Sequence, residues 1–224
     1  MDLSKNRRII TTNDGSHTLF VPALNEQYHS IHGAVKEAEH VFLKMGLDEF
    51  IHPDRVSVNV FEVGFGTGLN ALLSAQWSTF KQKKLAYTSI EKFPVSKREF
   101  QQLNYGGIVD ANDLYTKITD AAWNGFTVIS ESFKLRKLKL DLLRDVLPNG
   151  FDIVFFDAFA PNKQPELWDT SVFEKIYSLM NKNSLMVTYC CQGQAKRNMI
   201  SAGFEVEKVP GPPGKREMLR ARKL

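Results

Sequence analysis

The sequence predicts an α/β protein with a mostly parallel sheet that ends in an antiparallel hairpin. Strand-like apolar runs alternate with amphipathic helical segments along most of the chain, an order that favours parallel pairing. The last two strand-like runs are joined directly by a Pro/Gly-rich loop, and directly joined strands pair antiparallel. The 224 residues are 43% hydrophobic and 24% charged, and no linker or repeat divides them, so we expect a single domain.

Composition argues against several classes of protein. No apolar run approaches the roughly 18 residues that span a bilayer, and the first residues are polar. The two cysteines, Cys190 and Cys191, are adjacent and cannot form a disulfide framework, and the five histidines lack metal-ligand spacing. We therefore expect a cytoplasmic protein without membrane contact or a metal. The net charge of +4 permits a polyanionic partner but does not require one.

The N-terminal part, residues 1–52, is expected to cover a core formed by residues 53–224. Residues 1–30 suggest short strands or loops. A helix is predicted next, because Val35, Ala38, Phe42 and Met45 share one face, and Gly46 is expected to end it as a C-cap.

The following segments alternate between strand and helix patterns. Strands are predicted over residues 56–63 and 85–90, and a helix over 69–80 with an apolar stripe. A second helix is predicted over 94–103, where Pro94 suits the first turn.

Two further strand-like runs, 126–130 and 133–140, predict a hairpin, with a bulge or twist where the alternation slips at Arg136-Lys137. Residues 152–157 place four apolar residues between two carboxylates, which indicates a central strand buried on both faces. The remaining predicted elements are a helix capped by Thr170 or Ser171, a strand over 185–190, a short helix over 194–201, and the hairpin strands 204–209 and 217–222.

A glycine-rich turn lies between the first strand and its helix. Gly64, Gly66 and Gly68 let the backbone approach a ligand closely at a helix N-terminus. A dinucleotide fingerprint would have its third glycine at position 69, where this chain has leucine. Glu62, just before the turn, would repel a pyrophosphate but can pair with a cationic amino-acid group. A turn that binds nothing is the alternative interpretation.

Two more carboxylates follow strands of the predicted sheet. Glu91 stands where a carboxylate can accept hydrogen bonds from two ribose hydroxyls. Together with the turn, it indicates an adenosine ligand with a cationic tail, namely S-adenosylmethionine. Asp157 follows the most buried strand and should face the cleft, where Phe159, Pro161 and Trp168 could form an apolar wall. Alternatively, Asp157 caps the loop, and Phe159 and Trp168 belong to the core.

Basic residues give weaker signals. Lys134, Arg136, Lys137 and Lys139 indicate a solvated face more than a nucleic-acid track. The pair Lys215-Arg216, on the Pro/Gly loop, is a better candidate for phosphate contacts, although a plain exposed turn would look the same.

These residues together resemble the class I S-adenosylmethionine-dependent methyltransferases, with their Rossmann-like fold, and more narrowly the methyltransferase half of the bifunctional MnmC proteins of tRNA 5-methylaminomethyl-2-thiouridine biosynthesis. The resemblance extends from about Tyr28 to the C-terminus. The blocks that carry it are Val41-Phe42 after Glu37, Glu62 to Asn70, Glu91-Lys92-Phe93-Pro94, Asp157 to Trp168, and Gly214 to Leu219.

The resemblance implies methyl transfer to the aminomethyl nitrogen of a tRNA wobble uridine. The residues implied at the cofactor are Glu62, Gly64, Gly66, Gly68, Asn70, Glu91, Lys92, Asp141 and Asp157, the last also catalytic. Those implied at the substrate are Tyr28, Glu37, Phe159, Pro161, Trp168, Lys215 and Arg216. The family usually has glycine before the acid at 141, whereas this chain has Leu140. Bifunctional members continue into a flavin-dependent oxidoreductase, and no flavin is expected on this chain.

Other functions remain open at this point. A methyltransferase or aminopropyltransferase that acts on a free small amine would share the fold but would need no basic residues around the cleft to contact phosphates. A nicotinamide-binding protein would need the third glycine at position 69. A non-catalytic binding protein would need no carboxylate at the cleft.

Overall fold

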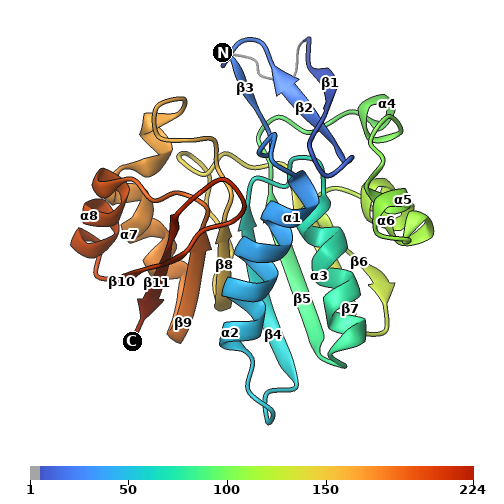
Figure 1. Ribbon diagram of the computed structural model, residues 1–224. Coiled ribbons are helices and arrows are strands. Elements are labelled where there is room, and N and C mark those ends of the chain that lie inside the picture. The colour runs from blue at the N-terminus through green and yellow to red at the C-terminus, as the bar shows by residue number, and fades with distance from the viewer. Residues whose placement is uncertain (1–5) are drawn as a thin grey trace.

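The computed structural model describes residues 6–224; the first five residues of the expected cover segment lie outside the described part. An eight-stranded sheet is covered by helices on both faces, and a small three-stranded sheet lies at one end of it (Figure 1). The strands of the large sheet, in spatial order, are β10 (Glu205–Pro210), β11 (Glu217–Lys223), β9 (Met180–Thr188), β8 (Phe151–Phe156), β4 (Ser57–Val63), β5 (Lys84–Ile90), β7 (Phe133–Leu138) and β6 (Gly125–Ser130).

Five neighbouring strands, β9, β8, β4, β5 and β7, run parallel. β6 pairs antiparallel with β7, and β11 pairs antiparallel with both β9 and β10. This arrangement confirms the predicted fold class and both hairpins. The chain order does not give the spatial order, however, because β11 and not β10 lies next to β9.

Each face of the sheet has its own apolar core. Side chains alternate along the central strands: Val60 and Phe155 belong to one core, whereas Phe61 and Phe156 belong to the other. The helices that accompany the first core are α1 (Ala34–Ala38), the π-helical segment η1 (Glu39–Leu47), α2 (Asp48–Phe50), α3 (Leu69–Phe80), α4 (Lys97–Phe100), α5 (Tyr105–Ile108) and α6 (Asn112–Asp120). The second core lies beneath the 3₁₀ turn η2 (Pro165–Trp168), α7 (Thr170–Leu179) and α8 (Gly193–Ser201).

The small sheet consists of β1 (Arg8–Thr11), β2 (His17–Val21) and β3 (Glu26–Gln27), all antiparallel. Two side chains from elsewhere in the chain anchor it. The Asn104 amide donates a hydrogen bond to Gly15 O, and the Lys163 ammonium donates to the carbonyls of Leu24 and Asn25 at 3.0 and 2.9 Å. The expectation of short strands over residues 1–30 is confirmed for the described residues.

Gly46 does not end the first helix, which continues to Phe50. A Cβ at this position would lie 3.2 Å from Val187 and 3.3 Å from Phe155. Glycine is therefore present because the helix packs closely on β8 and β9, a reason that the local pattern does not reveal.

Two helix starts also differ from the prediction. The helix predicted over 94–103 is only α4, which begins after Ser96, where Ser96 and Glu99 form a capping box. At α7 the N-cap is Asp169 rather than Thr170 or Ser171, and no side chain caps it.

The predicted bulge at Arg136-Lys137 is wrong. The register shift lies in β6 between Val128 and Ser130, and β7 alternates without interruption. The apparent slip arises because Lys137 occupies an inward position: it is fully buried, and its ammonium donates to the carbonyls of Ile118 and Thr119 at 3.0 and 2.8 Å. Lys137 is therefore not part of a solvated face.

Candidate cofactor-binding and active site

A cavity of about 350 Å³ opens where β4, β5 and β8 end, and the small sheet contributes to its wall. The predicted site residues that line it are Tyr28, Glu37, Gly64, Gly66, Asn70, Glu91, Lys92, Asp141, Asp157, Phe159 and Lys215. Five predicted residues do not line it: Glu62, Gly68, Pro161, Trp168 and Arg216. The sheet thus brings together residues that are up to 187 positions apart in sequence, from Tyr28 to Lys215.

The glycine turn has no space for a side chain at Gly64 or Gly66. Gly64 and Gly66 both have positive φ angles, +92° and +50°. A Cβ on Gly64 would lie 2.8 Å from the carbonyl oxygen of Asp157, and one on Gly66 would lie 3.0 Å from the Tyr28 ring. Gly68, also with positive φ, serves as the N-cap of α3 and contacts Phe65 rather than the cavity.

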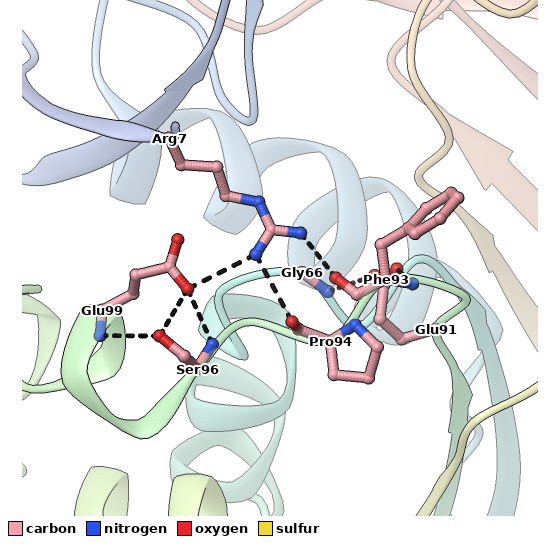
Figure 2. A network of polar contacts seen from close by, with 7 residues as sticks. All are labelled: Arg7, Gly66, Glu91, Phe93, Pro94, Ser96 and Glu99. Carbon is pink, nitrogen blue, oxygen red and sulfur yellow. Dashed lines mark hydrogen bonds and ion pairs between the residues drawn. The ribbon is translucent and has the colours of Figure 1, made fainter. Parts of the chain in front are cut away.

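Glu91 is held by two backbone amides. Its Oε2 accepts from the N–H of Gly66 at 3.0 Å and its Oε1 from the N–H of Phe93 at 2.7 Å (Figure 2). Each carboxylate oxygen has two lone pairs, so both can accept a further hydrogen bond from a ligand in the cavity. The geometry is compatible with the predicted acceptor of ribose hydroxyls.

One amide joins two carboxyl groups beneath the turn. Asn70 Nδ2 donates to Glu62 Oε1 at 3.0 Å and to Asp157 Oδ2 at 2.8 Å. The second oxygen of Glu62 accepts from the hydroxyl of Ser89. Asn70 Oδ1 is buried and has no hydrogen-bond partner among the described residues.

Both of these carboxyl groups hold protons more strongly than usual. Burial raises the pKa of Glu62 to about 7, against the hydrogen bonds from Ser89 and Asn70, which lower it. Burial also raises the pKa of Asp157 well above its ordinary value, and the nearby Glu62 and Glu37 carboxylates add to this rise, whereas Asn70 and Lys215 oppose it. A cation placed beside them would favour their ionised forms.

Near Asp157, the cavity wall also carries an ion pair that joins α1 to the loop between β10 and β11. Lys215 Nζ lies 2.8 Å from Glu37 Oε1 and 4.1 Å from the centre of the Tyr189 ring. The other Glu37 oxygen accepts from the Ser30 N–H, and the Tyr189 hydroxyl donates to Ala158 O, next to Asp157. Lys215 is thus already paired with a carboxylate, in contrast to the exposed Arg216.

At the far end of the cavity, Lys92 Nζ pairs with Asp141 Oδ2 at 2.8 Å. This ion pair holds the pKa of Asp141 below its usual value against the effect of burial. Apolar side chains from Leu140, Leu142 and Leu143 stand beside it in the cavity wall. This corner can therefore receive a flat, mostly apolar group with polar edges.

Trp168 belongs to the core, as the alternative interpretation had it. Its ring is buried against Phe156 and Phe173, and its Nε1 donates to the carbonyl of Phe159 at 2.8 Å. Phe159 itself lines the cavity and meets the Tyr28 ring edge to face, with centroids 5.2 Å apart. Trp168 therefore supports the wall from behind.

Sequence reasoning missed several cavity residues: Phe65, Phe93, Leu142, Leu143 and Tyr189. Each of them follows either the end of a strand or Asp141. Their place after strand ends is the sequence signal that could have indicated them. Within residues 6–224, no group of three or more His, Cys, Asp or Glu side chains is placed to hold a metal ion.

The cavity fits S-adenosylmethionine by its own chemistry. A bare glycine turn, a carboxylate with free lone pairs at a strand end, and the Asp157 carboxyl group, whose ionised form a cation would favour, are features that suit an adenosine with a cationic tail. A family model described as S-adenosyl-L-methionine-dependent methyltransferase matches residues 112–224.

The chain belongs to this methyltransferase family. It is 33% identical over 226 aligned residues to the tRNA 5-methylaminomethyl-2-thiouridine biosynthesis bifunctional protein MnmC of Cupriavidus metallidurans. The alignment covers 95% of this chain and 33% of that protein. The MnmC protein of Burkholderia mallei is 32% identical over 222 residues, which are 90% of this chain and 33% of the relative. This methyltransferase chain thus spans about a third of the length of the curated relatives it matches.

Solved structures agree with the family. The crystal structure of MNMC2 from Aquifex aeolicus superposes with a TM-score of 0.74 at 25% identity, over 97% of this chain and 70% of that one. Spermidine synthase from Thermotoga maritima superposes with a TM-score of 0.52 at 12% identity, over 97% of this chain and 69% of that one, and shares the fold alone. In the described part of this methyltransferase, no helix is both long and apolar enough to cross a bilayer.

Proposed function

We propose that this methyltransferase acts on the aminomethyl nitrogen of the wobble uridine in tRNA and completes the 5-methylaminomethyl group. The names of the relatives support the substrate, and the cavity supports the chemistry. The observation that carries the proposal is the placement of Asp157, a half-buried residue in the wall of the cofactor cavity, whose backbone carbonyl lies against the glycine turn.

S-adenosylmethionine, when bound, supplies an activated methyl group on a sulfonium. The protein then has to align an amine with this group and keep the amine lone pair free, and it needs no covalent nucleophile. We assign this task to Asp157, which can accept a hydrogen bond from the amine N–H, orient the lone pair and take up the proton that leaves.

The surroundings of Asp157 support this role. The Asn70 amide fixes Oδ2, which leaves Oδ1 to face a substrate. The rings of Tyr28 and Phe159 form an apolar wall against which a base flipped out of the anticodon loop can stack. Glu91, Lys92 and Asp141 are assigned to the nucleoside of the cofactor, whereas Glu62, which does not line the cavity, acts through the Asn70 amide that it shares with Asp157.

A cytoplasmic location follows from a tRNA substrate and is part of the same proposal. The absence of a flavin site on this chain stays a prediction. A free small amine is the competing substrate, and no observation in the cavity favours it over tRNA.

The test is methylation of tRNA from cells that lack this activity, followed by mass analysis of the nucleosides. Asp157→Asn should lower turnover by about 10²- to 10⁴-fold, the range of a lost acid–base group, and weaken cofactor binding much less. Glu131→Gln, in the exposed turn between β6 and β7, is the control and should retain full turnover. Methylation of a free amine but not of tRNA would contradict the proposed substrate, and normal turnover of Asp157→Asn would contradict the assigned role.

A further inference from the structure

Arg7, just before β1, reaches into a loop that is far away in the sequence. Its side chain has no exposed surface. Its guanidinium donates to the carbonyl oxygens of Phe93 at 2.6 Å and Pro94 at 3.4 Å, and it lies 3.5 Å from Glu99 Oε2. The loop after β5 has no regular structure, so its carbonyl groups depend on such donors.

The same loop holds the carboxylate at the cofactor cavity. The carbonyl of Phe93 accepts from Arg7, while the N–H of Phe93 donates to Glu91 Oε1. The other Glu91 oxygen accepts from the N–H of Gly66 in the glycine turn. Figure 2 shows these contacts, which lead from Arg7 to the Phe93 carbonyl, through the backbone of Phe93 to its N–H, and on through Glu91 to Gly66.

Arg7 also lies near a second residue of the cavity wall, Tyr28. Its guanidinium lies 5.6 Å from the centre of the Tyr28 ring, and Tyr28 lies against Gly66 and Phe159. Glu99, which pairs with Arg7, accepts from the N–H and hydroxyl of Ser96 and thereby caps α4. The N–H groups of the Arg7 guanidinium therefore connect the residue before the small sheet with the loop after β5 and with the start of α4.

We propose that Arg7 is a positioning residue, whose guanidinium fork holds the Phe93 and Pro94 carbonyls, fixes the backbone of Phe93, and so keeps the Phe93 N–H aimed at Glu91, which holds that carboxylate in place for the ribose hydroxyls of the cofactor. Arg7 does not line the cavity, so it acts on the cofactor indirectly, through Phe93 and Glu91. Guanidinium is suited to this task because its rigid, planar donors reach several acceptors at once. The proposal rests on the assignment of Glu91 to the ribose, which belongs to the proposed function.

The test compares the binding of S-adenosylhomocysteine with that of its 2′-deoxy analogue by calorimetry, without tRNA. Wild type should prefer the ribose form. Arg7→Met, which keeps most of the apolar stem, should bind S-adenosylhomocysteine about tenfold more weakly and lose most of this preference, because a charge-assisted hydrogen bond is lost. Arg8→Met is the matched control, since Arg8 is the exposed neighbour, and it should behave as wild type.

A general loss of stability would weaken binding of both ligands equally and leave the preference for ribose unchanged. That outcome in Arg7→Met overturns the proposal. If Arg7→Met does not fold, Arg7→Lys serves instead, because lysine keeps the charge but not the fork; an unchanged preference in Arg7→Lys also overturns the proposal. A Glu91→Gln variant that keeps the preference contradicts the ribose assignment itself, whereas failure to methylate tRNA leaves this inference untouched.

Discussion

A single amide group, that of Asn70, determines how two acids share the floor of the cavity. It donates to both Glu62, which is buried, and Asp157, which is half-buried, and the two acids would otherwise repel each other when ionised. Only Asp157 of the two lines the cavity. The sequence placed both acids at strand ends, but it could not show that one acid supports the other through a shared donor.

The raised pKa values predict how cofactor binding depends on pH. Burial raises the pKa of Glu62 to about 7 and that of Asp157 above its ordinary value, whereas a cationic ligand favours the ionised groups. Binding should therefore release protons, and affinity for S-adenosylmethionine should rise as pH increases through about 7, by up to about tenfold per pH unit for each proton. Calorimetry at several pH values, in buffers of different ionisation enthalpy, measures both quantities.

The Glu62→Gln variant should show a weaker pH dependence, since one titrating group is gone, and a flat profile in wild type would contradict the prediction. The same groups affect stability in the ligand-free protein. A carboxyl group whose pKa is raised by folding binds more protons when folded, so the contribution of Glu62 to stability falls as pH rises from about 4.5 through about 7.

The helical stretch from α1 to α2 shows what packing adds to a local pattern. The apolar spacing predicted the helix, and Val41 and Phe42 are buried as expected. The end of the helix was missed because glycine has two uses, as a C-cap and as a residue that permits close approach. At Gly46 the second applies, because the rings and branched side chains of β8 and β9 stand directly above it.

Gly46→Ala should therefore destabilise the protein, although alanine is the better helix former. The added methyl would lie within 3.3 Å of Val187 and Phe155, and overpacking of this kind costs about 1–3 kcal/mol. Denaturant unfolding measures the change in the free energy of unfolding. Gly107→Ala in α5 is the control, because its methyl would meet only one atom, at 3.9 Å, and it should not be destabilised. Equal effects of the two substitutions would contradict this account.

Across the whole molecule, N-terminal and C-terminal segments meet at the cavity. The ion pair between Glu37 and Lys215 connects α1 with the loop of the last hairpin, and Arg7 and Lys163 attach the small sheet to loops of the large one. The proposed division into a cover of residues 1–52 and a core of residues 53–224 remains a prediction. The pairing of Lys215 changes its expected role, because its charge is already balanced by a carboxylate.

The salt dependence of tRNA binding should separate Lys215 from Arg216. Each phosphate contact contributes about 0.7 to 0.9 to the slope of log affinity against log salt concentration. Arg216→Ala should lower this slope by about that amount, since Arg216 is exposed. Lys215→Ala should change the slope little, because Lys215 is paired with Glu37. The reverse result in a filter-binding titration would show that the ion pair opens to contact tRNA.

The sequence by itself determined the parallel sheet, its two hairpins, and the strand ends at which Gly64, Glu91 and Asp157 stand. These features depend on local periodicity and on the order of elements, which neighbouring residues express directly. Only the tertiary structure decided that Trp168 supports the wall from behind, that Lys137 is buried, and that Arg7 reaches Phe93. These contacts join residues that are distant in sequence, and their geometry depends on how separate elements pack, so no local pattern encodes them.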